Sequence, residues 1–165
     1  MAEAVPADDA LAPLWQQMDA RALKRAARCP VLLVDLHFQR LDRWLHMTQR
    51  LEGPVLSAAS MAAAERESSL LKEIMLEAWT LGRTMPRALS LLFGMASEVT
   101  GTILKLGASD IDRIALEEAR HLKARWPESR TFWKGLLEAA IGTDDRALSY
   151  VHLHCLQLLG SEALP

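Results

Sequence analysis

The stretch "LGASDIDRIALEEARHLKARWPESRTFW", residues 106–133, contains the order of elements that decides the fold. Ser109 can cap a helix, and two aspartates follow in its first turn, where negative charge is favourable at the positive end of the helix dipole. The residues "HLKARW" then alternate in polarity, and Pro127 and Ser129 introduce an aromatic-rich second helix. We therefore expect a helix, a short extended step and another helix in this order.

The rest of the chain has the composition of a helical protein. Alanine, leucine, glutamate and arginine dominate, β-branched residues are scarce, and the turn spacing typical of β-sandwiches is missing. The chain has 165 residues, half of them apolar, which is enough for a substantial core in one domain or in two small intertwined ones. We expect an all-α fold of one small helical domain or two related helical halves, with at most short extended segments.

Proline, glycine and low-complexity stretches suggest how the chain is divided. The Ala/Ser-rich stretch after Gly53 and Pro54 fits either a weakly packed helix or a linker between two halves. A strongly amphipathic helix begins at Ser69 and ends near Gly82. The expected parts are a disordered tail at 1–12, an N-terminal helical half at 13–52, a linker or weak helix at 53–68, and a helical domain at 69–160.

A second stretch, "LKRAARCPVLLVDLHFQRLDRWL", resembles the opening one. The two align without gaps at a spacing of 88 residues, which pairs Phe38 with Trp126 and Trp44 with Phe132. Few positions are identical, so both a diverged duplication and a coincidence of helical periodicity remain open. The residues "VLLV" within it fit either a short strand or the buried start of a helix.

Positive charge is concentrated in one part of the sequence. The formal net charge is −2, yet residues 21–50 hold seven Lys and Arg against two Asp. This segment is the natural candidate for contacting DNA phosphates, with a solvated basic face or a surface for an acidic partner as the alternatives. The candidate DNA-contact residues are Arg21, Lys24, Arg25, Arg28, Arg40 and Arg43.

A helix-turn-helix arrangement is a further hypothesis. Its first helix would be Ser97–Leu106, its turn would contain Gly107, and its second helix would be Ser109–Ala119. The second helix carries four acidic residues against Arg113 alone, and an acidic helix repels phosphates. Contact with DNA is therefore expected from the basic N-terminal helix and not from this one.

Large aromatic side chains are numerous for a small helical protein. Such units have little interior for five tryptophans, and tryptophan is favoured at interfaces, so we expect some of these residues to lie at an interface and the protein to dimerise. The alternative is that they form the core. The interface candidates are Trp15, Phe38, Trp44, Trp79, Trp126, Phe132 and Trp133.

The sequence contains no motif of a known catalytic or metal site. It has no glycine-rich phosphate loop, no nucleophile elbow and no helical zinc motif, so we expect no enzyme, no cofactor and no metal. In "HLHC", His152 and Cys155 share a helix face while His154 points elsewhere, which favours packed histidines over a metal site.

The two cysteines, Cys29 and Cys155, fit a reducing cytosol, and no long apolar run predicts a membrane span. We expect a cytoplasmic protein.

The order of segments between about Lys72 and Leu159 resembles FlhD, the smaller subunit of the bacterial flagellar transcriptional activator. The segments are "LKEIMLEAWTLGR", "ALSLLFGM", "SEVTGTILKLGASDIDRIA", "HLKARW" and "DDRALSYVHLHCLQLL". The family typically has a leucine-glycine pair, an arginine-aromatic pair and a histidine in its last helix. The corresponding residues in this sequence are Phe93-Gly94, Arg125-Trp126 and His152. Leu122 stands where such proteins often carry a cysteine, so no covalent dimer through that position is expected, and the first 70 residues are an addition.

The resemblance implies a dimerising, all-helical regulator that works with a second subunit, FlhC, in which the zinc site and much of the DNA contact reside. We therefore expect a transcriptional regulator subunit that acts as a homodimer or higher homo-oligomer, through protein contacts with an FlhC-like partner and secondary contacts with DNA. The alternative is an adaptor or secretion chaperone with no nucleic-acid role. A small enzyme or metal protein that uses the histidines is the third hypothesis.

Overall fold

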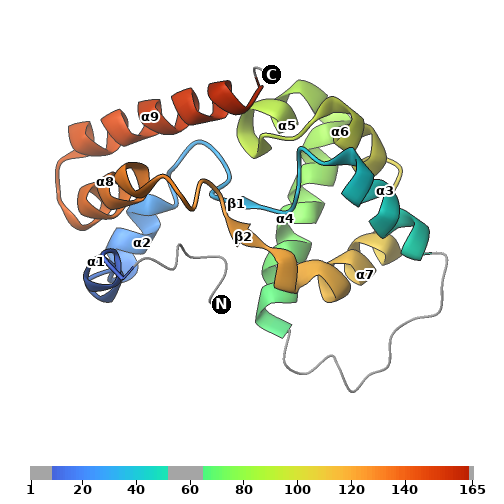
Figure 1. Cartoon of the computed structure of the whole chain (residues 1–165), viewed down its shortest axis with the longest axis horizontal. Helices are drawn as coiled ribbons and strands as arrows, with labels where there is room; N and C mark the ends of the chain where they lie inside the picture. Colours follow the sequence, from blue (N-terminus) through green and yellow to red (C-terminus); the bar gives the residue numbers. More distant parts are fainter. Residues whose placement is uncertain (1–8, 52–64, 164–165) are drawn as a thin grey trace. The chain divides into compact units, whose positions relative to one another are not determined.

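The computed structural model describes residues 9–51 and 65–163. Within them the regular secondary structure is almost all helical, with nine α-helices and one sheet of two very short strands (Figure 1), which confirms the expected all-α fold. The expected tail and linker lie largely outside the described residues. The helices are α1 Ala12–Gln16, α2 Ala20–Ala26, α3 Leu41–Arg50, α4 Glu65–Thr84, α5 Pro86–Phe93, α6 Ser97–Ile103, α7 Ala108–Glu118, α8 Arg130–Ile141 and α9 Asp145–Ala163.

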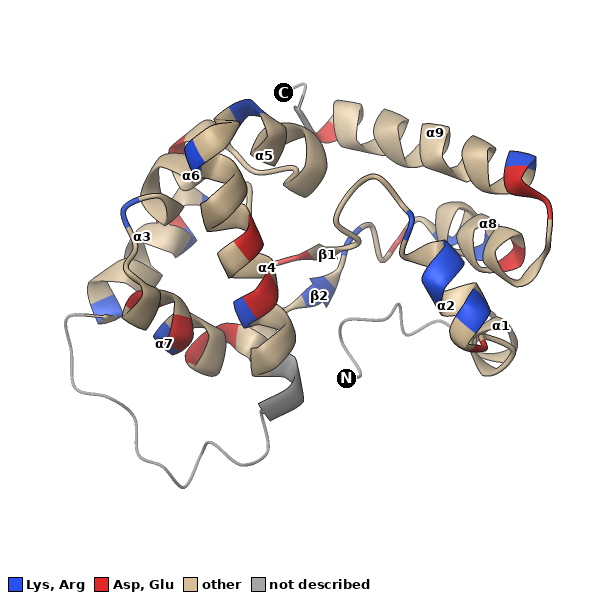
Figure 2. Ribbon diagram, turned by 180° about the vertical axis from the view of Figure 1, so that it is seen from behind, with Lys and Arg blue, Asp and Glu red and all other residues tan. Residues whose placement is uncertain are grey.

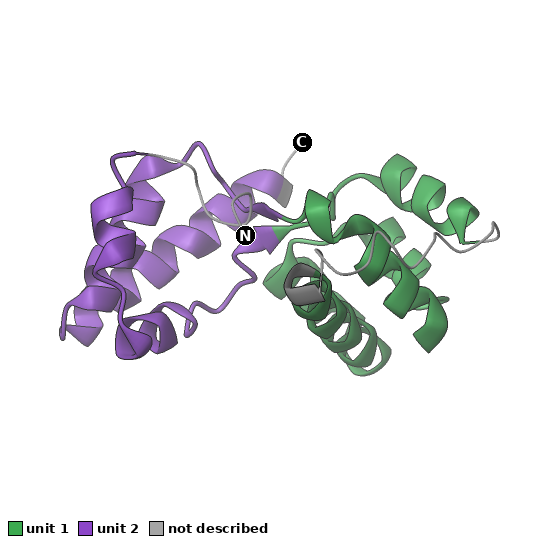
Figure 3. Cartoon of the chain, turned by 90° about the horizontal axis from the view of Figure 1, so that it is seen from below, with its two compact units in different colours: residues 1, 35–122 green, residues 2–34, 123–165 purple. Residues whose placement is uncertain are grey.

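The helices form two compact units, shown separately coloured in Figure 3. Unit 1 is the central segment Asp35–Leu122, and unit 2 combines the described residues up to Val34 with those from Lys123 onward. This division differs from the expected halves, because α1 and α2 pack on α8 while α3 packs on α6. Periodicity along a sequence shows that a helix has an apolar face but not which other face covers it.

Unit 1 is built around the long helix α4. Leu71, Met75 and Ala78 lie on one side of α4 and are fully buried, as their helical spacing predicts. That side packs against α7, where Ile111 and Ile114 are buried as well. Helix α5 also packs on α4. The buried apolar side chains of α4 and α7 therefore form much of the core of unit 1.

A proline and a glycine set the limits of α5. Pro86 stands at the first turn, where its missing N–H costs nothing, and Gly94 ends the helix with φ 60°. That left-handed conformation is strained for residues with a Cβ, and it lets the amide of Met95 donate to the carbonyl of Leu89 at 3.3 Å. The chain can then turn directly into α6.

Unit 2 is centred on α8. Its buried side chains include Phe132, Trp133 and Leu136, which are covered by α1, α2 and α9. The Phe132 ring meets the Trp133 ring edge to face, with ring centroids 5.5 Å apart, an arrangement that aromatic quadrupoles favour. At the start of α2 the carboxylate of Asp19 accepts a hydrogen bond from the amide of Ala22 at 2.7 Å, which makes Asp19 the N-cap of this helix.

The two similar stretches share one local structure. Strand β1, Val34–Asp35, pairs with strand β2, Lys123–Ala124, and each strand is followed by a residue with positive φ, His37 at 54° and Trp126 at 50°. The carbonyl of each positive-φ residue accepts the amide three residues on and the indole seven residues on. The indole donors are Trp44 at 3.2 Å and Trp133 at 3.1 Å.

This repetition supports a duplicated segment in a register that corrects the sequence alignment. Equivalent residues lie one position further apart than the spacing of 88, so that Trp44 matches Trp133 and not Phe132, and His37 matches Trp126. The N-caps of α2 and α7, Asp19 and Gly107, keep the spacing of 88, but the strands begin at Val34 and Lys123, which are 89 residues apart. Helix caps and strands therefore repeat with slightly different spacing. Of "VLLV", only Val34 is in a strand.

Candidate protein-interaction site

Five of the seven aromatic interface candidates are buried inside their own units. Phe38 and Trp44 stack in unit 1 with ring centroids 6.0 Å apart, and Trp126, Phe132 and Trp133 fill the core of unit 2. Each has 7% or less of its surface exposed. These side chains offer almost no surface to a partner, so the burial supports the alternative assignment to the core.

The other two aromatic candidates are only partly buried. The indole of Trp79 donates to the carbonyl of Leu106 at 3.0 Å, and the guanidinium of Arg83 lies 3.8 Å from its ring centroid, a cation–π contact. Trp15 packs against Trp133 with ring centroids 6.3 Å apart. Both side chains are therefore used mainly within their own unit.

Two of the six cationic DNA-contact candidates are engaged with carboxylates. Arg25 is mostly buried and joins α2 to the start of α9, through Asp145 at 2.5 Å, and to α8, through the carbonyl of Ala139 at 3.3 Å. Arg40 makes a two-bond pair with Asp42, which lowers the pKa of the Asp42 carboxyl to about 2 chiefly by hydrogen bonding. Arg25 in particular is a structural residue and does not fit the role expected from the sequence.

The remaining cations are divided between the two units. Arg21, Lys24 and Arg28 are exposed on and just after α2 in unit 2, where Figure 2 shows the positive charge of that helix. Arg43 is exposed on α3 in unit 1. The basic segment 21–50 thus contributes to each unit separately, and only the α2 group brings three exposed cations onto one short element.

Helix α9 is anchored to unit 2 near both ends. Asp145 in its first turn pairs with Arg25, and Glu162 in its last turn pairs with Arg125, which is 4% exposed. Glu162 also accepts the indole N–H of Trp126. These contacts hold the helix in one orientation, with Leu148, Cys155 and Leu159 turned into the core.

The opposite face of α9 is apolar and uncovered in the structure. Tyr150, Leu153 and Leu156 are 71%, 58% and 46% exposed. No Lys, Arg, Asp or Glu occurs from Ala147 to Ser161. Although Ser149 and Gln157 are exposed on the same side, large apolar residues extend beyond the one side that its unit covers. Helices of this composition are normally surrounded by protein, which makes this face a candidate interaction surface.

The histidines of α9 pack against their surroundings. Burial lowers the pKa of His152, which disfavours its charged form, and the His154 ring lies edge-on to Phe132 with centroids 5.8 Å apart. In residues 9–51 and 65–163 no three His, Cys, Asp or Glu side chains are grouped as metal ligands would be. The described geometry therefore gives no support to the metal hypothesis.

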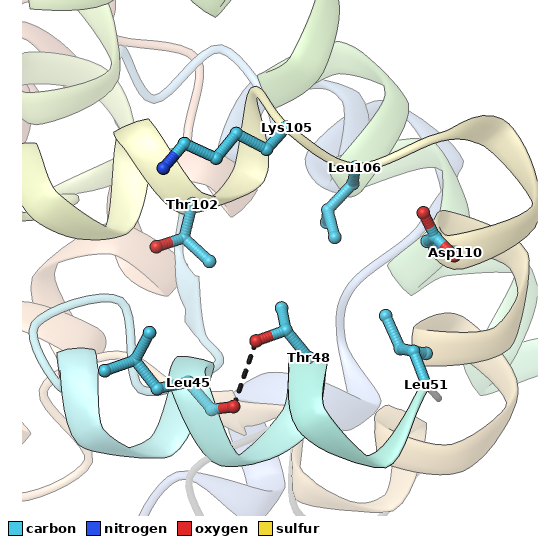
Figure 4. Close-up of a pocket in the computed structure, with 7 residues that line it drawn as sticks. All are labelled: Leu45, Thr48, Leu51, Thr102, Lys105, Leu106 and Asp110. Carbon is cyan, nitrogen blue, oxygen red and sulfur yellow. Dashed lines mark hydrogen bonds between the residues drawn. The ribbon is translucent and has the colours of Figure 1, made fainter. Parts of the chain in front are cut away.

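Unit 1 contains a pocket of about 370 Å³ bordered by α3, α6 and α7, shown in Figure 4. Leu45 of α3 and Leu51 just after it line one side and Leu106 the other, with Lys105 and Asp110 at the edge. Most of the polar atoms are already used, since the hydroxyl of Thr48 and the carboxylate of Asp110 bond to backbone nearby. The pocket is therefore better suited to bind an apolar side chain than to catalyse a reaction.

The expected helix-turn-helix segment is present as two helices, α6 and α7, joined by a short turn. The acidic residues of α7 are held by cations of unit 1, because Arg50 pairs with Glu117 and Glu118, and Lys72 pairs with Asp112 at 2.7 Å. Since α7 also packs on α4, it supports the unit and presents no basic surface to DNA.

The exposed face of α9 was not among the residues singled out from the sequence. The sequence predicts an interface of tryptophan and phenylalanine, whereas the uncovered residues of α9 are Tyr150 and two leucines. The available signal was the uncharged run from Ala147 to Ser161, in which apolar residues occur at positions that cannot all face one side of a helix.

Comparisons of the chain with protein-family models, with curated proteins and with solved structures find no match. None of the helices in the described part of the chain has the length and apolarity needed to pass through a membrane.

Proposed function

We propose that this protein is a non-enzymatic subunit of a transcriptional regulator similar to FlhD, which works through protein contacts and adds secondary contacts to DNA. The observation that carries the proposal is the uncovered apolar face of α9, where Tyr150, Leu153 and Leu156 lie exposed on a helix anchored at both ends. Large apolar side chains grouped on one fixed face are typical of a surface that another polypeptide covers.

The α9 face is complementary to itself. When two α9 helices pack antiparallel about Leu153, Tyr150 of each copy faces Leu156 of the other, as a two-fold interface requires. Arg146 of one copy then reaches the last turn of the other α9, where unpaired carbonyls carry partial negative charge. There Gly160 has no neighbouring atom within 4 Å of the place of a Cβ, which leaves room for the guanidinium. We therefore infer that the first partner is a second copy of this chain.

The expected affinity of this dimer is modest. Full burial of a leucine-sized side chain contributes about 1.5–3 kcal/mol, and each copy contributes three side chains that are roughly half exposed. After the free-energy cost of association is subtracted, a dissociation constant of about micromolar to submillimolar is the result. A second subunit of the FlhC kind would raise the stability of such a dimer by mass action.

The DNA role rests on Arg21, Lys24 and Arg28. All three are exposed, they lie on and just after one short helix, and two copies in a dimer bring six cations to one particle. Each phosphate contact releases counterions, so each cation that contacts DNA adds about 0.9 to the slope of log affinity against log salt. Three cations per copy can make secondary contacts with DNA, but on their own they are too few for tight DNA binding.

The experiment measures binding of the full chain to duplex DNA at two salt concentrations by fluorescence anisotropy, with and without the co-purifying partner from the source cells. Replacement of Arg21, Lys24 and Arg28 by Ala together should flatten the salt slope by about 3 for a monomer. The matched control is Arg87→Ala, an exposed cation of unit 1. Unchanged affinity and slope in the triple variant would exclude the DNA role.

An adaptor or secretion chaperone without a nucleic-acid role is the second candidate. It is favoured by the formal net charge of −2 and by the pairing of Arg25 and Arg40 with carboxylates. A pull-down from the source cells separates the two candidates. An adaptor brings down one protein and no DNA, whereas a regulator brings down a transcription subunit and retains its salt-dependent affinity for DNA.

A further inference from the structure

The two cysteines of the chain lie together in the core of unit 2. Cys29 follows the end of α2 and Cys155 lies in α9, far apart in sequence, yet their Sγ atoms are 3.5 Å apart and share a hydrogen bond. The sequence gives no reason to expect this, because the two segments meet only when the N-terminal helices pack with α8 and α9.

The two thiols differ in access and in chemical state. Cys155 is completely buried, whereas Cys29 is partly exposed to solvent. The hydrogen bond with Cys155, and a further one from the amide of Val31, lower the pKa of Cys29. The hydrogen bond with Cys29 and burial raise the pKa of Cys155, so that it stays protonated. Cys29 is thus the accessible nucleophile, and Cys155 is a thiol held next to it.

We propose that Cys29 and Cys155 are an oxidation site that closes to an intramolecular disulfide when the protein meets a hydroperoxide. The Cys29 thiolate attacks one peroxide oxygen, the O–O bond breaks, and Cys29 becomes a sulfenic acid while the peroxide is reduced to water or an alcohol. The sulfur of Cys155 then attacks the Cys29 sulfur, the S–O bond breaks, and water leaves with the Cys155 proton.

The geometry requires only a small movement for the second step. A disulfide has an S–S distance of about 2.05 Å, so the two sulfurs must approach by about 1.5 Å, which rotation of the Cys29 side chain can largely supply. Cys29 lies outside regular helix, where such a rotation disturbs little, while Cys155 stays fixed by the core. The product links the N-terminal segment of unit 2 to α9 by a covalent bond.

The experiment uses the reduced full chain, treated with a small molar excess of hydrogen peroxide and analysed by intact mass and peptide mapping. The expected product is a monomer that has lost two hydrogen atoms, contains a Cys29–Cys155 linkage, resists alkylation and returns to the dithiol with dithiothreitol. Its Tm should exceed that of the reduced protein by several degrees, because the bond closes a very long loop.

Two variants assign the roles. In Cys155→Ala the Cys29 sulfenic acid has no neighbouring thiol, so dimedone should label Cys29 several-fold more than in the wild type. In Cys29→Ala the buried Cys155 should stay unlabelled, and circular dichroism checks that each variant is folded. The proposal is overturned if peroxide leaves the wild-type mass unchanged, if it gives only disulfides between chains, or if Cys155 is the residue labelled. None of these readouts depends on the α9 face or on DNA.

Discussion

Replacing Arg113 by methionine should destabilise unit 1 strongly, because its side chain is only 16% exposed and is held in a network of acids and carbonyls. Its guanidinium donates to the carbonyl of Leu51 at 2.7 Å, to the carbonyl of Arg50 at 3.0 Å and to the carboxylate of Glu117 at 2.9 Å. One side chain therefore closes the end of α3 and neutralises an almost buried acid on α7. Methionine keeps the length of the aliphatic part and removes only the charge and the donors.

The magnitude follows from what is left without a partner. Two carbonyls at the end of α3 lose charge-assisted hydrogen bonds, and Glu117 and Glu118, 9% and 7% exposed, keep Arg50 as their shared cation. Removing one member of a mostly buried network costs about 3–5 kcal/mol, since the remaining acid is neither hydrated nor fully paired.

The assay is urea unfolding followed by circular dichroism, with hydrogen exchange of α3 and α7 amides to locate the loss. The matched control is Lys72→Met, which removes a cation from a pair with Asp112 in which both side chains are about half exposed. An exposed pair of this kind contributes less than about 1 kcal/mol. A loss in Arg113→Met no larger than in the control would refute the importance of this network.

Four further substitutions test individual features of the two units. The pKa of Asp42, measured by NMR, should be about 2 and should rise toward 3.8 in Arg40→Gln. Because folding lowers this pKa, the stabilisation by the pair is present above pH 3.8 and is lost as the pH falls toward 2. Gly94→Ala should cost about 1 kcal/mol of unfolding free energy in urea, because φ 60° strains a residue with a Cβ. Trp44→Phe and Trp133→Phe should each cost about 1–3 kcal/mol in the same assay if the repeated indole–carbonyl bond stabilises both segments.

Much of the local structure follows from the sequence. The cap at Asp19, the start of α5 at Pro86 and its end at Gly94 are short-range effects of side-chain chemistry. The cap expected at Ser109 is two residues earlier, at Gly107, whose amide donates to the carboxylate of Asp110. The apolar face of α4 was likewise predicted from the spacing of its residues. Local signals of this kind depend on neighbours within a few residues, which the sequence displays directly.

The pairing of distant segments could not be read in the same way. Arg25 was expected at a DNA surface because its neighbours are basic, but it is held by Asp145 and by the carbonyl of Ala139, which packing of α2 on α8 brings within reach. The proximity of Cys29 and Cys155 has the same origin. A single sequence contains the donors and acceptors but not the long-range contacts that bring them together.

The tryptophans show why composition alone does not identify an interface. Large aromatic residues favour interfaces and cores alike, and here the repeated indole–carbonyl bond uses Trp44 and Trp133 to hold a strand-to-helix turn inside each unit. The surface left over consists of ordinary leucines and Tyr150, which single-residue statistics do not mark as special. Their significance appears only when the covered face of α9 is known.

The most direct test of the central claim is sedimentation equilibrium of the full chain over a wide concentration range. The α9 interface predicts a reversible monomer–dimer equilibrium with a dissociation constant of about micromolar to submillimolar, which Leu153→Arg abolishes at an unchanged circular dichroism spectrum. Leu116→Arg, which alters a leucine 40% exposed on α7, should leave the equilibrium as it is. A wild-type chain that stays monomeric at every concentration, or a dimer that Leu153→Arg does not weaken, would contradict the account.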